Sequence, residues 1–158
     1  MSDFPLPVAG AIDGPVHRYA LRVYYEDTDA GGVVYHANYL RWFERARSDM
    51  LELMGIDQAA SLNAGEGAYA VAEASLRYLA PARLGDIVHI ETRAGTVGRA
   101  SSTLLQSAWR GETKLTEASV RVGFIGPDGR PRRQPATWQQ AFDAFAAAQE
   151  TSSPEGQE

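Results

Sequence analysis

The feature that most constrains this chain is one long helical pattern followed by four strand patterns. The helix is capped by Asn38 and ends at Gly55, residue types that favour these two positions. Its apolar residues recur at helical spacing, and most of them are bulky: Tyr39, Leu40, Trp42, Phe43, Ala46, Met50 and Met54. A helix with so broad an apolar surface is expected to lie buried against a sheet.

The sheet is predicted from five alternating segments. A first strand begins near residue 18, where Leu21, Val23 and Tyr25 lie on one face. Four more strands follow the helix, at residues 68–79, 86–97, 102–110 and 115–125. Turn residues between them predict hairpin connections in an antiparallel meander. Together these elements predict an α+β fold in which one antiparallel sheet wraps around one long helix.

The length of 158 residues and a hydrophobic content of 44% indicate one domain with a real core. We expect a flexible N-terminal segment at residues 1–16 and the folded domain at residues 17–148. The domain ends in an amphipathic helix at residues 137–148, and residues 149–158 are expected to form a disordered tail. The exposed edges of such a sheet favour pairing between subunits, so we expect a homo-oligomer.

Composition excludes several classes of function. With 15 basic and 20 acidic side chains the net charge is −5, and no basic run is present, which argues against nucleic acid as a partner. The absence of cysteine excludes disulfides, thiolate nucleophiles and cysteine-based metal sites. The first residues carry neither a basic start nor a sustained apolar run, so we expect no secretory signal or membrane span and a cytoplasmic location.

The residues that can carry chemistry gather directly before the helix. Asp27, Asp29, a glycine pair and His36 precede Asn38. A helix start exposes unpaired backbone amides, and those near residues 35–38 can stabilise negative charge on a substrate oxygen. A carboxylate beside them can direct water at a polarised carbonyl, as a hydrolase requires. Read alone, however, an aspartate in such a loop more often stabilises a turn.

Two stretches carry a resemblance to a known family. The first joins Tyr25, Asp27-Thr28-Asp29, Gly32, Val34, Tyr35-His36 and Asn38-Tyr39, and the second is residues 78–86. Both resemble the hot-dog acyl-CoA thioesterases. Within them the chain is most similar to the subgroup encoded with the bacterial Tol-Pal envelope system, which is related to 4-hydroxybenzoyl-CoA thioesterase. The similarity covers roughly residues 18–124.

This resemblance implies specific roles. It makes Asp29 the catalytic carboxylate and places Tyr25 and His36 in the same site, whereas Asp27 is expected to bond loop amides. It implies an acyl-CoA substrate bound at a subunit interface, in dimers that assemble into tetramers, with an acyl carrier protein as a further candidate partner. No metal or redox cofactor is implied. The family often contacts coenzyme A phosphates from a basic turn, and here that turn offers only Arg99.

Alternatives remain at this point. Asp27-x-Asp29 begins like a calcium loop, but Asn38 stands where the closing glutamate should be. The resemblance favours short aliphatic acyl-CoA, while an aromatic acyl-CoA thioesterase, a hot-dog hydratase or dehydratase, and a non-catalytic acyl-CoA or acyl-carrier binding module stay open. Sequence also leaves open whether Asp29 activates water or attacks the thioester directly to form a mixed anhydride.

Overall fold

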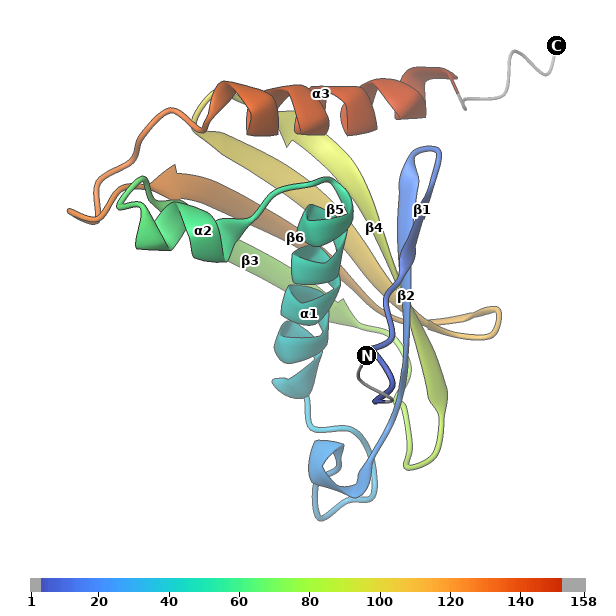
Figure 1. Cartoon of the computed structure of the whole chain (residues 1–158). Helices are drawn as coiled ribbons and strands as arrows, with labels where there is room; N and C mark the ends of the chain where they lie inside the picture. Colours follow the sequence, from blue (N-terminus) through green and yellow to red (C-terminus); the bar gives the residue numbers. More distant parts are fainter. Residues whose placement is uncertain (1–3, 152–158) are drawn as a thin grey trace, which may run out of the picture.

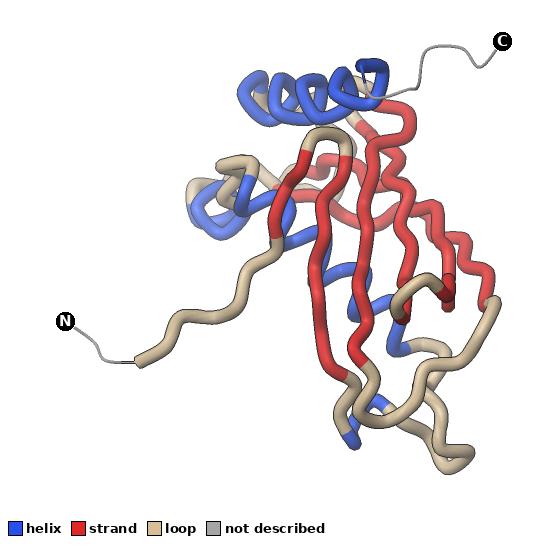
Figure 2. Tube along the Cα trace, turned by 90° about the vertical axis from the view of Figure 1, so that its right-hand side faces the viewer, coloured by secondary structure: helices blue, strands red, loops and turns tan. Residues whose placement is uncertain are grey.

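The computed structural model describes residues 4–151 and contains the predicted sheet and helix (Figure 1). Its elements are β1 (Ala11–Asp13), β2 (Val16–Arg22), the 3-10 helix η1 (Tyr25–Asp27), α1 (Asn38–Leu53), α2 (Gln58–Asn63), β3 (Ala68–Tyr78), β4 (Ile87–Val97), β5 (Ser101–Arg110), β6 (Thr113–Ile125) and α3 (Ala136–Thr151). The six strands form one antiparallel sheet in the order β1-β2-β4-β5-β6-β3. The sheet curves around α1, which confirms the predicted α+β architecture (Figures 1 and 2).

The predicted meander holds for only part of the sheet. β4, β5 and β6 follow one another through short turns, but β3 does not pair with β4. β3 lies at the edge beside β6, and β4 pairs with β2 instead. The length of the connection between β3 and β4 argues against a hairpin there. It comprises residues 79–86 and exceeds the roughly two to five residues of a typical hairpin loop.

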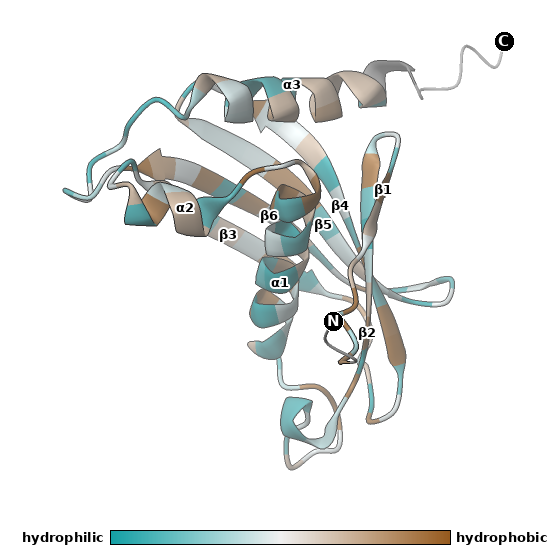
Figure 3. Ribbon diagram, in the orientation of Figure 1, coloured by the Kyte–Doolittle hydropathy of each residue, from teal (hydrophilic) through white to brown (hydrophobic). Residues whose placement is uncertain are grey.

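The core lies between α1 and the concave face of the sheet. Trp42, Phe43 and Ala46 of α1 are buried against alternating residues of β4, β5 and β6, such as Ile90 and Val120. The visible side of α1, which faces away from the sheet, is largely hydrophilic (Figure 3). Buried and exposed residues alternate along β4, β5 and β6, so one face of the sheet is buried and the other is wetter.

A second apolar cluster seats α3 across one end of the sheet. Trp138, Phe142 and Phe145 pack with Met50 and Phe124, and Figure 1 shows α3 lying over the ends of β4 and β5. α3 extends to Thr151, beyond the predicted end at residue 148, while residues 152–158 of the predicted tail lie outside the described residues. None of the helices within residues 4–151 combines the length and apolarity needed to cross a bilayer.

Residues 10–16 belong to the folded domain, although residues 1–16 were predicted to be flexible. β1 pairs with β2, and Val16 is buried. The Gly10 N–H and the His17 ring both bond the same Asp49 oxygen on α1, at 3.0 and 2.7 Å. The folded domain thus begins near residue 10. The Asp49 carboxylate of α1 fixes this segment, although its glycines and prolines alone predict irregular structure.

Candidate active site

The loop between β2 and α1 folds as a small hairpin with Asp29 near its tip. The Asp29 N–H donates to the Val33 carbonyl at 2.9 Å, and Thr28 pairs with Val34 in an isolated bridge. The Gly32 N–H bonds the Asp29 carbonyl at 3.1 Å to close the turn, and Gly32 has a φ of +78°, which favours glycine. The glycine therefore shapes the loop that presents Asp29.

The Asp29 carboxylate is exposed and only half engaged. Its Oδ1 accepts the Gly31 N–H at 2.8 Å, an interaction that fixes the side chain to its own loop. Its Oδ2 has no hydrogen-bond partner among residues 4–151. One oxygen thus holds the carboxylate in place, and the other is available to a ligand or a water molecule.

Asp27 has the structural role that we predicted. Its Oδ2 accepts the Tyr24 N–H at 2.7 Å, and its Oδ1 accepts the Asn38 side-chain amide at 2.8 Å. The Asp27 carbonyl also accepts the Tyr35 N–H at 2.9 Å. Asp27 therefore ties the two ends of the hairpin to the start of α1, and both of its carboxylate oxygens are occupied.

Two backbone amides directly before α1 are free. Ala37 occupies the N-cap position without a side-chain cap, because Asn38, the predicted cap, bonds Asp27 instead. The Tyr35 and Asn38 N–H groups have carbonyl acceptors, whereas those of His36 and Ala37 have none within the described part of the chain. Of the predicted amides at residues 35–38, only those of His36 and Ala37 are therefore available as donors at the positive end of the helix.

The loop is fastened to the turn between β3 and β4, the second stretch of the sequence resemblance. The Val34 N–H donates to the Ala82 carbonyl at 2.9 Å, and Val33 pairs with Arg83. Asp86 holds this turn by accepting the Arg83 N–H at 2.8 Å and the Arg110 guanidinium at 3.0 Å.

These contacts, the Arg83 N–H first and then Arg110, lower the pKa of the Asp86 carboxyl below its ordinary value. Because the folded-state pKa is depressed, the contribution of Asp86 to stability is complete above the ordinary carboxyl pKa. It is lost as the pH falls through the lowered value. At neutral pH the turn is therefore fully held by its ionised aspartate.

His36 lies between two tyrosines at the end of the loop. Its ring centroid is 4.6 Å from that of Tyr35 and 6.2 Å from that of Tyr78, which meets it edge-on. The Tyr78 hydroxyl donates to the His36 carbonyl at 2.8 Å. The His36 side chain is exposed to solvent.

The prediction for Tyr25 was wrong in its geometry. β2 ends at Arg22, and Tyr25 begins η1 rather than continuing an inward-facing strand pattern. The Asp27 carboxylate bonds the Tyr24 N–H and favours this tight turn over an extended strand. Tyr25 is consequently 84% exposed in the single chain. It shares the loop with Asp29 but lines no packed interior.

Arg99 lies far from the other predicted residues. It occupies the turn between β4 and β5, where its carbonyl accepts the Gln134 N–H at 3.2 Å. That turn lies beside α3, at the opposite end of the sheet from the loop before α1 (Figure 1). One chain therefore brings Asp29, His36 and Tyr25 into a single loop but leaves Arg99 apart from them.

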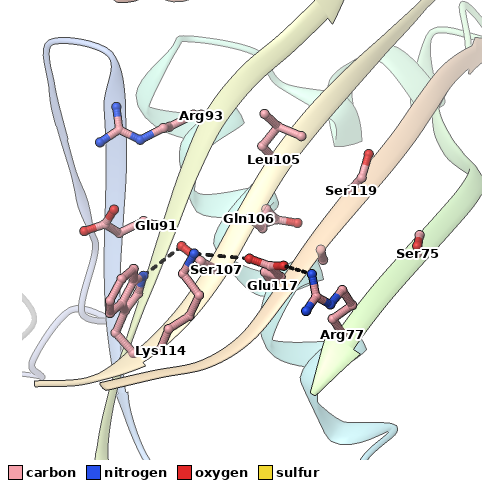
Figure 4. Close-up of a pocket in the computed structure, with 12 residues that line it drawn as sticks. Ser75, Arg77, Glu91, Arg93, Leu105, Gln106, Ser107, Lys114, Glu117 and Ser119 are labelled. Carbon is pink, nitrogen blue, oxygen red and sulfur yellow. Dashed lines mark hydrogen bonds and ion pairs between the residues drawn. The ribbon is translucent and has the colours of Figure 1, made fainter. Parts of the chain in front are cut away.

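A separate hollow of about 520 Å³ lies on the outer face of the sheet, away from α1 (Figure 4). Its charges are largely paired: Glu117 bonds both Arg77 at 3.2 Å and Lys114 at 3.1 Å. The Lys114 ammonium also lies 5.2 Å from the centre of the Trp109 ring. Asp29, His36 and Tyr25 do not line this hollow, so it is separate from the predicted chemistry.

Sequence reasoning gave no role to Tyr78, although it lies within the second stretch of the resemblance. A tyrosine ending a strand pattern carries no signal of its own, and its contact with His36 spans 42 positions of sequence. Only the packing of β3 beside α1 reveals it.

Residues 4–151 contain no group of three or more His, Asp or Glu side chains placed to hold a metal ion.

Comparison with known proteins agrees with this fold. Residues 31–117 match the thioesterase superfamily. The chain is 43% identical over 120 residues to an acyl-CoA thioester hydrolase, YbgC, of Escherichia coli O6:H1, covering 75% of this chain and 89% of that one. A probable thioesterase from Bartonella henselae has a TM-score of 0.72 at 34% identity, covering 76% of this chain and 99% of that one.

A 4-hydroxybenzoyl-CoA thioesterase from Pseudomonas sp. strain CBS-3 shares the fold at 21% identity, with a TM-score of 0.72 over 80% of this chain and 99% of that one. The architecture is thus the hot-dog fold that the sequence resemblance implied. The chain belongs to the thioesterase superfamily.

Proposed function

We propose that this protein hydrolyses acyl-CoA thioesters, releasing a carboxylic acid and coenzyme A, with Asp29 as the catalytic carboxylate. The observation that carries the proposal is the half-engaged Asp29 side chain in the same loop as two free amides. Its Oδ1 is fixed by Gly31, and its Oδ2 has no partner among the described residues. The His36 and Ala37 N–H groups, without acceptors in residues 4–151, can hold a thioester oxygen.

The reaction follows from this arrangement. Two routes fit: Asp29 accepts a proton from water as it attacks the carbonyl carbon, or Asp29 attacks first and water then hydrolyses the mixed anhydride. In either route negative charge develops on the substrate oxygen beside the free amides. The carbon–sulfur bond then breaks, and the thiolate takes up a proton. The proposed chemistry uses no metal and no redox cofactor.

His36 and Tyr25 are proposed to complete the site around Asp29. The exposed His36 ring, beside the free amides, is suited to orient water or to protonate the leaving thiolate. Tyr25 projects from η1 with most of its surface uncovered, as expected for a side chain that meets a partner subunit. We therefore place the complete site at an interface between two chains.

The edge strand β3 supports that placement. β3 has an unpaired long side, and residues 71–75 are all exposed in the single chain. An eleven-residue edge of this kind is a template for pairing with a second copy. The position of Arg99 also supports an interface site. Arg99 and the Asp29 loop lie at opposite ends of one sheet, so a coenzyme A molecule that contacts both is more easily explained if the two come from neighbouring chains. We propose a dimer as the minimum and a tetramer as the larger assembly.

Substitution of Val71 by lysine tests this assembly. Val71 is 49% exposed on β3, and an edge lysine opposes strand pairing between chains because its ammonium must be desolvated. Val71→Lys should shift the mass in light scattering from a multiple of 17.2 kDa toward the single chain and lower turnover in parallel.

The matched control is Leu105→Lys, because Leu105 is 46% exposed but lies on the central strand β5. It should leave the mass unchanged if only the β3 edge mediates the dimer. An unaltered mass for Val71→Lys would contradict pairing through this edge.

For the substrate, we propose a short aliphatic acyl-CoA, processed in the cytoplasm. A panel from acetyl-CoA to dodecanoyl-CoA, with benzoyl-CoA and 4-hydroxybenzoyl-CoA, should give the highest kcat/KM for short aliphatic chains when free thiol is measured. Fastest turnover of the benzoyl derivatives would instead identify an aromatic acyl-CoA thioesterase.

Two further arms separate the other classes. Hydration of enoyl-CoA without thiol release would indicate a hydratase. Tight binding of acyl-CoA with negligible turnover would indicate a binding module. The same panel presented on an acyl carrier protein tests that partner, and a higher kcat/KM than for the matching acyl-CoA would favour the carrier-bound substrate.

A further inference from the structure

We infer that Tyr78 is a positioning residue that orients the free amides at the start of α1 through its hydroxyl group. This inference rests on the proposed function, in which those amides hold the thioester oxygen. The Tyr78 hydroxyl donates to the His36 carbonyl at 2.8 Å. The N–H groups of His36 and Ala37 lack acceptors in the described part of the chain.

Peptide geometry connects the two observations. The His36 carbonyl and the Ala37 N–H belong to one planar peptide group, and in a trans peptide they point in opposite directions. The described chain contains no cis peptide bond. When Tyr78 holds the carbonyl on one side, the Ala37 N–H is directed to the other side. The same contact restrains the backbone of His36, which carries the second free amide.

The Asn38 N–H donates to the Tyr35 carbonyl at 2.9 Å and closes the turn over residues 36 and 37, but within the described residues only Tyr78 bonds the His36 carbonyl itself. The helix start has no side-chain cap, and the Asp27 bonds reach Tyr35 and Asn38 on either side but not residues 36 and 37. Without Tyr78, the His36 carbonyl loses its hydrogen bond, and the His36–Ala37 peptide can tilt within the turn that the Asn38 N–H closes. A rotated peptide directs its N–H away from the substrate oxygen, and misplacement of a catalytic group by about 1 Å can cost a hundredfold in rate.

Tyr78 is itself held rigidly. It is the last residue of β3 and pairs with Thr116 of β6, and the next residue, Leu79, bonds the Leu115 carbonyl at 2.8 Å. Its ring meets the buried Tyr39 ring of α1 edge-on, with centroids 5.7 Å apart. A donor carried by a strand and packed on the helix it serves keeps its direction better than one on a loop.

The hydroxyl remains a donor over the working range of pH. Burial raises the pKa of Tyr78 above the ordinary tyrosine value of 10.0. The phenol is therefore protonated at neutral pH and donates to the carbonyl, which can only accept.

Tyr78→Phe tests the inference, since it removes the hydroxyl and keeps the ring that packs on Tyr39 and His36. We expect kcat to fall by about ten- to a hundredfold, with KM changed by less than about threefold. The matched control is Tyr69→Phe, which removes a hydroxyl bonded to Gln134 at 2.5 Å beside α3. The control should keep its kcat. All variants are assayed at a temperature where circular dichroism shows them folded.

A spectroscopic readout separates positioning from a purely structural role. In Asp29→Asn protein, which should bind substrate without turning it over, the infrared carbonyl band of ¹³C-labelled butyryl-CoA or benzoyl-CoA should move to lower frequency on binding. Adding Tyr78→Phe should reverse most of that shift, whereas adding Tyr69→Phe should not. The fraction of folded protein does not affect the frequency of the bound band.

The outcomes distinguish the inference from the function on which it rests. Unchanged kcat in Tyr78→Phe, or a rise in KM alone, would overturn the positioning role while a dead Asp29→Asn enzyme still supports the proposed function. An unshifted carbonyl band in the Tyr78-containing protein would show that the amides do not hold the thioester oxygen, and would overturn that part of the proposed function together with the inference. Full turnover by Asp29→Asn would instead overturn the proposed function.

Discussion

Asp29→Asn is expected to lower kcat by about three orders of magnitude while the loop keeps its fold. General-base catalysis contributes about 10²- to 10⁴-fold, and a neutral amide neither accepts the proton from water nor attacks the thioester. The fold should survive because the asparagine Oδ1 can still accept the Gly31 N–H that Asp29 accepts at 2.8 Å. Thiol release measures the rate, and thermal unfolding checks the fold.

Asp27→Asn is the matched control, two positions away in the same loop. Asp27 accepts hydrogen bonds on both oxygens, from Tyr24 and from Asn38, and an asparagine has only one acceptor oxygen. This variant should lose about 1–2 kcal/mol of stability, in line with one unsatisfied polar group, and keep far more activity than Asp29→Asn. Turnover by Asp29→Asn above about a tenth of the unaltered rate would contradict the assignment.

Among the substitutions predicted here, Gly67→Ala should lower the free energy of unfolding most. A β-carbon at this position would lie 2.2 Å from the Ile125 carbonyl oxygen, and the φ of Gly67 is +127°. Both atoms in the clash are backbone or bound directly to it, so neither can turn aside as a flexible side chain does. We expect about 3–5 kcal/mol of destabilisation, or a fall in Tm of roughly 6–20 °C for a chain of this size.

Gly65→Ala separates the clash from backbone strain. Gly65 also has a positive φ, +71°, but an added β-carbon there meets nothing within 4 Å. It should cost only about 1–2 kcal/mol. Both proteins are compared at equal concentration, because oligomerisation makes Tm depend on concentration. Equal Tm values for the two variants would show that the approach of Gly67 to Ile125 is not a rigid constraint.

The hydrophobic pattern predicted the elements well, for a local reason. Period and turn residues placed the helix at α1 and four strands within about two residues of their observed ends, since these signals depend on near neighbours in sequence. The pattern missed β1 and α2, both short, and it misjudged the partner of β3. Strand pairing depends on contacts that no short window of sequence contains.

The candidate site likewise has features that the sequence predicts and features that it does not. Asp29, His36 and Tyr25 share one loop because they are close in sequence, and the role of Asp27 as a loop anchor could be predicted from side-chain chemistry. Tyr25 was placed on the wrong element because a bond from Asp27 competed with the strand pattern. The free amides of residues 36 and 37 could not be singled out, because the bond that draws Asn38 away from capping comes from across the loop.

The sequence by itself determined the position of the apolar helix, the strands that pack against it and the loop that carries the acidic groups. Those properties follow from side-chain polarity and spacing along a few turns of chain. Only the tertiary structure decided that β3 becomes a free edge, that Arg99 lies at the far end of the sheet, and that Tyr78 reaches the His36 carbonyl. Each of these depends on where distant segments meet, and that is fixed by the packing of the whole sheet around α1.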